Sequence, residues 1–157
     1  NYSCTYGAYP PRIAKTAGIS LEEAQILFDG YWKRNWSILK IADDCRVKQV
    51  GDQLWLFNPV SKLWYSLRAE KDKFSTLNQG TGAYCFDIWV GFVLKEIQTL
   101  VGQFHDEIIL VIDDNEKEEK RVEDILKSAI RKTNDFLRLN RDLDIGTEVG
   151  YNYGSVH

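Results

Sequence analysis

The chain has 157 residues, a formal net charge of −3 and a 44% share of hydrophobic residues, the size and composition of roughly one globular domain. The slight acidic excess argues against a generally basic nucleic-acid-binding protein, although it leaves room for a local basic strip. The sequence shows no apolar run of membrane-spanning length, no signal peptide and no CxxC pair among its three cysteines. These features argue against a membrane partner, a disulfide framework or a structural zinc site, and they favour a reducing, cytoplasmic location.

The N-terminal part of the sequence predicts short helices. The proline pair at 10–11 is expected to end any helix there, and residues 12–17 are expected to form a short helix that stops at Gly18. Ser20 and Glu23 have the spacing of a capping box at the start of a longer helix. Apolar residues at intervals of three and four define one face of that helix: Leu21, Ala24, Leu27, Phe28, Tyr31 and Trp32.

The middle of the sequence predicts a hairpin followed by a long helix. Residues 46–57 and 63–67 alternate loosely between apolar and polar side chains, and an Asn-Pro turn between them is typical of a β-hairpin. Residues 71–98 are expected to be helical, although Gly80 and Gly82 weaken a helix by up to about 1 kcal/mol each relative to alanine. Two glycines in one turn indicate that something approaches the backbone closely, and a helix–helix crossing explains them equally well.

The last third of the sequence predicts a strand, a capped helix and a tail. Residues 107–112 form an apolar, strand-like run, and the acidic cluster at 113–116 suits the N-terminus of a helix, which favours negative charge. That helix is expected to reach about Leu139, with the buried stripe Val122, Ile125, Leu126, Ala129, Ile130 and Phe136. The aromatic, glycine-rich tail at 148–157 is expected to pack on the sheet. Together these elements predict an α+β fold.

The tripeptide His105-Asp106-Glu107 is the most informative feature of the sequence. It lies between an apolar segment and the strand-like run, so its two carboxylates are expected at the mouth of a buried strand. Neighbouring like charges and desolvation both make that placement costly, and a divalent cation would remove the cost. The tripeptide therefore indicates a Mg²⁺ site at a β-turn. The plainer interpretation is a solvated hairpin tip, because short motifs match by chance.

Three motifs in order resemble the C-terminal part of the A-family DNA polymerases, the bacterial polymerase I and podophage replicase type. Residues 2–7 resemble the end of motif B on the nucleotide-binding helix, in which three residues separate an aromatic residue from Tyr-Gly. Gln79-Gly80 follows within a predicted helix, and His105-Asp106-Glu107 is similar to motif C of the palm. Asn1 and His157 also match residues usual at these places. The resemblance covers nearly the whole chain and implies helices plus an antiparallel palm hairpin.

The resemblance implies a two-metal site at motif C. Asp106 would bridge two Mg²⁺ ions that stabilise the attacking 3′-hydroxyl and the leaving pyrophosphate. Glu107 would lie beside these ions in an auxiliary position, and His105 would contact the primer end. The resemblance further implies that residues 1–45 are distal fingers helices and that residues 46–157 are the C-terminal half of the palm.

The resemblance also implies contacts with the deoxynucleoside triphosphate and the primer–template. Tyr2 would stack near the incoming sugar and Tyr6 near the templating base, although their spacing also suits one face of a packed helix. Gln79 would reach the minor groove, where hydrogen-bond acceptors vary little with sequence; a plain surface position is the alternative. Arg68 and Lys71 would contact phosphates or the primer–template, although a lysine here is expected to be solvated in any fold.

Several family features are missing from this sequence. Motif A, with the first catalytic aspartate, and the triphosphate-binding arginine and lysine of motif B are absent, and Ser75 stands where the family has asparagine. The sequence contains no methionine, which suits a processed or truncated product. The chain is therefore expected to be the C-terminal piece of a split or processed polymerase that is inactive without an N-terminal partner. The alternatives are a non-catalytic DNA- or protein-binding module on a palm-like scaffold, and an unrelated α+β metal protein.

Overall fold

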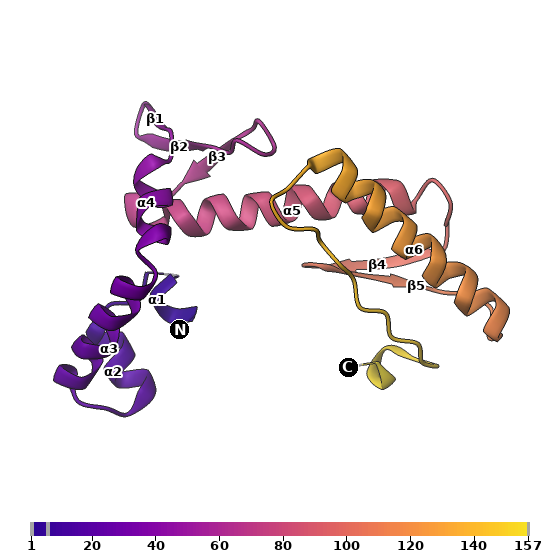
Figure 1. Ribbon diagram of the computed structural model, residues 1–157, viewed down its shortest axis with the longest axis horizontal. Helices are drawn as coiled ribbons and strands as arrows, with labels where there is room; N and C mark the ends of the chain where they lie inside the picture. The colour runs from indigo at the N-terminus through magenta and orange to yellow at the C-terminus, as the bar shows by residue number, and fades with distance from the viewer. Residues whose placement is uncertain (1, 6, 157) are drawn as a thin grey trace. The chain divides into compact units, whose positions relative to one another are not determined.

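The computed structural model describes residues 2–5 and 7–156, leaving aside the side chains of residues 2 and 3, and it has the predicted α+β fold (Figure 1). The chain divides into two compact units, Asn1–Thr81 and Gly82–His157. The assignment of residues 1–45 and 46–157 to fingers and palm stays a prediction. Every helix among the described residues is too short or too polar to cross a membrane.

The first unit combines helices with a three-stranded antiparallel sheet. Its elements are, in chain order, α1 (Tyr2–Thr5), α2 (Pro10–Ala17), α3 (Leu21–Arg34), α4 (Trp36–Asp44), β1 (Val47–Val50), β2 (Gln53–Phe57), β3 (Trp64–Leu67), the 3-10 helix η1 (Glu70–Asp72) and the first part of α5 (Lys73–Val93).

The helical part confirms the predicted caps and corrects the prediction for the prolines. The Ser20 side chain accepts a hydrogen bond from the Glu23 backbone N–H at 3.2 Å, and the Glu23 carboxylate accepts one from the Ser20 N–H at 2.9 Å. Gly18, with φ of 67°, ends α2 in the left-handed conformation. Pro10 and Pro11 begin α2 instead of ending a helix, because the first helical turn has no use for their missing N–H groups.

The predicted apolar face of α3 is only partly covered. Ala24 is buried, and the Phe28 ring packs between Tyr9 and Trp32, with centroid separations of 6.3 and 6.2 Å. Leu21 and Leu27 on the same face are exposed. Helix periodicity identifies an apolar face, and it does not say whether the same chain covers that face.

The predicted hairpin is a sheet of order β1-β2-β3, so the run at 46–57 contains two strands where one was expected. Gly51, with φ of 59°, permits the tight turn that separates β1 from β2. The β2–β3 pair is the expected hairpin, with Leu56 opposite Tyr65. In the turn of this hairpin, the buried Asn58 side chain donates to the Thr81 hydroxyl at 2.9 Å and accepts from the Val60 N–H at the same distance.

The sheet packs on α5 through Tyr65 and Gly80. The Tyr65 hydroxyl donates a hydrogen bond to the Gly80 carbonyl at 3.2 Å. A Cβ atom added at Gly80 would lie 3.0–3.2 Å from three atoms of the Tyr65 ring, whereas one added at Gly82 would meet open space. Within this unit, the close approach predicted from the glycine pair is therefore made by a side chain of the sheet at Gly80.

The second unit is a two-stranded antiparallel sheet packed on two helices. It contains the rest of α5, β4 (Leu100–Phe104), β5 (Glu107–Leu110), α6 (Glu116–Leu137) and the 3-10 helix η2 (Tyr153–Ser155). Its core is built by apolar residues of α5 and its C-terminal turn and of α6: Trp89, Val90, Val93, Ile97, Val122, Leu126, Ala129 and Ile130. The cluster predicted at the N-terminus of this last long helix is confirmed. Asn115 caps α6, and its side chain accepts a hydrogen bond from the Glu118 N–H at 2.9 Å.

Two predictions for this unit need correction. Phe136 was expected in the buried stripe of α6, but it is 59% exposed and touches only the edge of the core through Phe92, with ring centroids 6.5 Å apart. The tail was expected to pack on the sheet. Tyr153 does contact Phe104 of β4, with ring centroids 6.3 Å apart, but most of the tail is exposed, including Tyr151. The aromatic content of the tail predicted packing, but it does not show how many of the tail's rings a two-stranded sheet can bury.

Alanine at the two α5 glycines is expected to have opposite effects on stability. Gly80→Ala should lower the free energy of unfolding by about 1–3 kcal/mol, because the hydrogen-bonded Tyr65 ring has to move. Gly82→Ala should raise it by about 0.5–1 kcal/mol, because alanine suits an open helical position better than glycine. Urea denaturation of the two variants measures both values, and equal stabilities would contradict the close Tyr65–Gly80 packing.

Candidate functional site

The tripeptide His105-Asp106-Glu107 lies at the end of the β4–β5 hairpin. Phe104 and Glu107 form the last pair of the antiparallel ladder, and His105 and Asp106 make the two-residue turn between them. The predicted strand–turn–strand arrangement is confirmed. The second strand ends at Leu110, two residues earlier than the apolar run suggested.

His105 adopts a left-handed backbone conformation, with φ of 47°. Residues other than glycine seldom do so, although histidine is among the side chains that tolerate this region best. The first turn position would be occupied at lower conformational cost by glycine. Residues with a strained backbone conformation are often found at functional sites, where the side chain binds a ligand or takes part in catalysis.

The two faces of the hairpin have different surroundings. Ile108 and Leu110 pack against the core formed by α5 and α6. Because side chains alternate along a strand, Glu107 points to the opposite face, as its ladder partner Phe104 does. The hairpin therefore holds one carboxylate in its turn and a second on the face turned away from the core.

The burial of these carboxylates differs from the expectation. Asp106 and His105 are exposed and Glu107 is half-buried, so the desolvation cost predicted for a buried strand mouth is absent at Asp106. Within the described part of the chain, no group of three His, Cys, Asp or Glu side chains is arranged to hold a metal ion. Mg²⁺ prefers six oxygen ligands and keeps several waters. Asp106 and Glu107 could supply at most two carboxylates, and water or groups from another segment would complete such a site.

The predicted DNA-contacting residues belong to the first unit, and the hairpin belongs to the second. Gln79 is exposed on α5, immediately before the glycine that receives the Tyr65 ring. Arg68 is exposed and forms an ion pair with Asp72, with Nη2 and Oδ2 3.0 Å apart. Lys71 is exposed in η1 and makes no ion pair with any described residue. Each of the three is accessible to a ligand.

The predicted nucleotide-binding residues are described only in part. The backbone of Tyr2 lies in α1, as the motif requires, but its side chain and the whole of Tyr6 lie outside the described residues, as does His157. The described part of the motif ends at Gly7, where φ is 79° and the N–H donates to the Cys4 carbonyl at 3.0 Å. The helix α1 ends at Thr5, and the resemblance to motif B stays a prediction.

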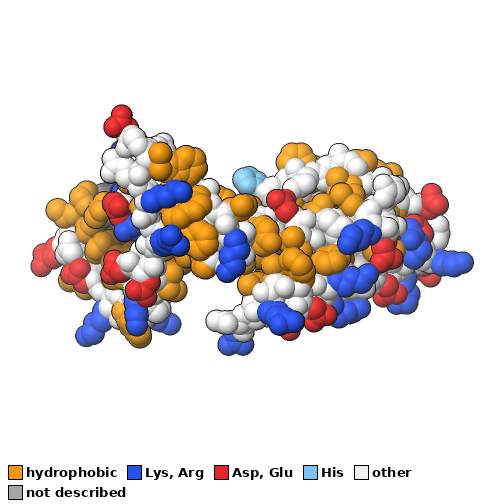
Figure 2. Space-filling view, turned by 90° about the horizontal axis from the view of Figure 1, so that it is seen from above, with side chains coloured by type: hydrophobic (Ala, Val, Ile, Leu, Met, Phe, Trp, Pro, Cys, Tyr) orange, Lys and Arg blue, Asp and Glu red, His pale blue; other side chains and the backbone are white. Residues whose placement is uncertain are grey.

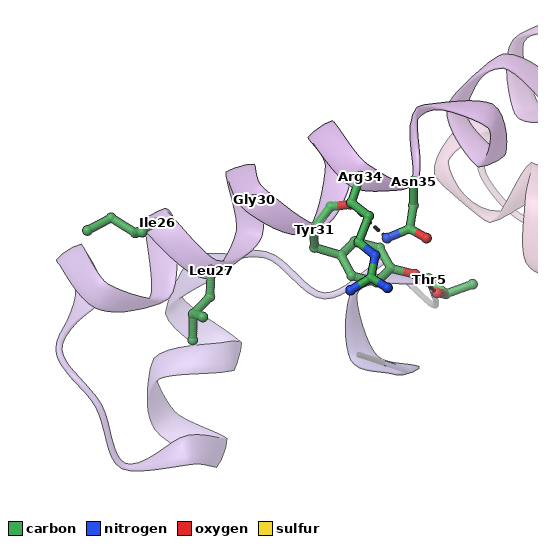
Figure 3. Close-up of a pocket in the computed structure, with 7 residues that line it drawn as sticks. All are labelled: Thr5, Ile26, Leu27, Gly30, Tyr31, Arg34 and Asn35. Carbon is green, nitrogen blue, oxygen red and sulfur yellow. Dashed lines mark hydrogen bonds between the residues drawn. The ribbon is translucent and has the colours of Figure 1, made fainter.

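An open groove lies between α1 and α3, with a volume of 580 Å³. Figure 3 shows Ile26 and Leu27 at one end, Gly30 in the middle and Arg34 beside the Tyr31 ring at the other. The Tyr31 hydroxyl is hydrogen-bonded to Thr5, which ties α3 to the motif B segment. The groove combines apolar side chains with a cation that has no ion pair among the described residues.

Sequence reasoning missed a surface on the three-stranded sheet. Arg46 and Lys48 lie over aromatic rings there, and Trp55 stands between β1 and β3. The signal in the sequence is the unbroken apolar run Leu54–Phe57, because alternation puts successive side chains on both faces of a sheet. Because α5 covers only one face of the sheet, an apolar run in its central strand also places apolar side chains on the other face, to which the sequence alone assigned no role.

Neither the known protein family models nor the curated protein sequences give a match to this chain.

Glycine and alanine at position 105 should separate the backbone conformation of the turn from the chemistry of the imidazole. Both variants lose the side chain, but only glycine relieves the left-handed strain, so His105→Gly should be more stable than His105→Ala by about 1 kcal/mol. Thermal or urea unfolding measures the difference. Equal stability of the two variants would show that residue 105 does not hold a left-handed conformation.

Proposed function

We propose that this chain is the C-terminal part of a DNA-directed DNA polymerase of the A-family type. The observation that supports this most is the β4–β5 hairpin. Its turn carries His105 and Asp106, and Glu107 belongs to the ladder pair next to that turn. The arrangement suits motif C, in which the turn must stand free of its own core and meet DNA and a second carboxylate. The order of the three motifs along the chain supports the same proposal.

The proposed chemistry is nucleotidyl transfer with two Mg²⁺ ions. These ions, when bound, neutralise charge on the 3′-hydroxyl oxygen and the leaving pyrophosphate. Asp106 would bind both ions together with a carboxylate from an N-terminal part of the polymerase, and Glu107 would assist from the adjacent strand position. The exposure of Asp106 supports this role, because the missing ligands have to reach it from outside this chain. His105 would position the primer end.

DNA contacts are proposed for the cations and the amide of the first unit. The Arg68 side chain is exposed, whereas only 13% of the side chain of its partner Asp72 is exposed. The guanidinium carries five N–H donors, so it can contact a phosphate while its ion pair with Asp72 stays intact. Lys71 has no competing carboxylate among the described residues, and Gln79 can present an amide to the minor groove.

An obligate partner segment is supported by the apolar surface that the chain leaves uncovered. The chain exposes 11432 Å², whereas two separate compact domains sharing its mass equally would expose about 9800 Å². On α3 and α4, Ile26 is 66% exposed and Trp36 63% exposed. We infer that the N-terminal part of the polymerase covers this surface. Exposed apolar patches of this kind mark interaction sites.

The second candidate is a non-catalytic binding module on the same scaffold. It is favoured by the exposure of Arg68 and Lys71, which can bind phosphates without a metal ion. The two functions differ in one requirement. A polymerase needs the Asp106 carboxylate, and a binding module does not.

Neutralising Asp106 should abolish nucleotide addition by the complex of this chain with its N-terminal partner. In primer extension, Asp106→Asn should lower the rate by about 10³-fold or more, because a lost metal ligand removes several kcal/mol of transition-state stabilisation. DNA binding by the same complex should change little. The matched control is Asp113→Asn, which removes an exposed carboxylate of the same unit and should leave extension intact. Extension at the wild-type rate by the Asp106 variant would favour the binding module.

Sugar selection tests the motif B assignment independently. A tyrosine hydroxyl near the ribose 3′-position can replace a hydrogen bond that a dideoxynucleotide lacks. A site that supplies this hydrogen bond itself discriminates weakly between deoxynucleotides and dideoxynucleotides. The complex should therefore accept dideoxynucleotides readily, and Tyr2→Phe should reject them while deoxynucleotide incorporation stays nearly unchanged. Relative kcat/KM for the two substrates measures the shift. The same dideoxy discrimination in both proteins would remove Tyr2 from the nucleotide site.

A further inference from the structure

The three-stranded sheet has one face that α5 does not cover. Tyr65 and Leu56 belong to the face that packs on α5. The strand register places the alternate residues on the opposite side, which we call the outer face: Lys48, Val50, Gln53, Trp55, Phe57, Trp64 and Ser66. None of these seven residues is acidic. Seen from above, hydrophobic and basic side chains gather over the three-stranded sheet (Figure 2).

Two cations lie directly on the aromatic rings of the outer face. The Lys48 Nζ atom is 4.0 Å from the centroid of the Trp64 ring. The Arg46 guanidinium lies just before β1, with its Cζ atom 5.4 Å from the Trp64 ring and 5.6 Å from the Phe57 ring. Neither cation forms an ion pair with a described residue, so both keep their N–H groups available. Stacking on the rings holds their positive charge over the sheet.

Trp55 is the aromatic residue of this face that no cation covers. It sits on the central strand, opposite Lys48 on β1 and Ser66 on β3. Its indole is half-buried and makes no ring stacking, cation–π contact or hydrogen bond with any described residue. A flat, partly exposed ring is therefore held beside two unpaired cations.

We propose that the outer face binds single-stranded nucleic acid, with a base stacked on Trp55 and phosphates on Arg46 and Lys48. An open single strand offers flat bases that stack on any aromatic ring, and a phosphate backbone that pairs with cations. The absence of carboxylates from the face gives the charge complementarity. An acidic peptide would match the cations and would leave the indole unused. The inference goes beyond the proposed polymerase function, because it requires neither metal nor catalysis.

The binding test uses the 157-residue chain and a fluorescently labelled oligothymidylate of about 12 nucleotides, within the range that one such platform covers. Anisotropy titrations compare wild type with Trp55→Leu and Trp55→Phe. The leucine variant should bind about fivefold more weakly or worse, which is the loss of one stacked base, and the phenylalanine variant should keep most of the affinity. The control is Trp36→Leu on α4, which removes a more exposed indole of the same unit, 63% exposed, and should bind as wild type does.

Salt dependence tests the cations separately from the stacking. Lys48→Gln should reduce the slope of log Kd against log salt concentration by about 0.7, because one phosphate contact is lost. Lys40→Gln, at an exposed lysine of α4, should leave the slope unchanged.

Three results would overturn the proposal. The first is wild-type affinity in Trp55→Leu, and the second is an unchanged salt slope in Lys48→Gln. The third is displacement of the oligothymidylate by a duplex or an oligoglutamate of the same length as readily as by unlabelled oligothymidylate. Displacement by oligoglutamate would identify the face as an acidic-peptide site. Because Lys48→Gln keeps most of the stem of the side chain, its salt slope remains decisive even if Trp55→Leu fails to fold.

Discussion

The burial of Ile108 and Leu110 against α5 and α6 determines what the β4–β5 hairpin presents to solvent. Side chains alternate along a strand, so a slip of one residue would turn these two side chains outward and bring Glu107 and Ile109 into the core. A carboxylate that loses its hydration on burial destabilises the fold, whereas a buried isoleucine side chain stabilises it. The register is therefore strongly determined. It places Glu107 on the face of the hairpin that is turned away from the core, and His105 and Asp106 in the turn. All of the proposed metal chemistry depends on this placement.

Local signals in the sequence predicted local structure well. The capping box of Ser20 and Glu23, the stop at Gly18 and the two-residue turn at His105-Asp106 each involve groups within a few positions of one another. The prolines were misread because the same missing N–H that breaks a helix interior is harmless in a first turn. The extra strand was missed because apolar and polar residues alternate both before and after Gly51. The turn at Gly51 therefore did not stand out as the boundary between β1 and β2.

Signals that depend on distant neighbours were predicted less well. Phe136 has the spacing of a core residue, but the segments that cover the apolar face of α6 leave its C-terminal end at Phe136 exposed. The Gly80–Gly82 pair indicated a close approach, but which ring would fill the space depends on how β3 pairs with β2. The outer face of the sheet could not be recognised until the register put Arg46, Lys48 and Trp55 together. The exposure of Asp106 was likewise invisible, since an apolar strand beside it suggested burial.

The central claim is that the His105–Glu107 turn holds the catalytic metal ions of a shared polymerase site, and Fe²⁺-directed cleavage tests it most directly. Fe²⁺ in place of Mg²⁺ generates hydroxyl radicals that cut the polypeptide near the bound ion. In the complex of this chain with its N-terminal partner, primer–template and nucleotide, we expect cuts close to residues 105–107, and we expect Asp106→Asn to abolish them. Cuts confined to other segments, or a pattern at the turn that survives in the Asp106 variant, would contradict the account.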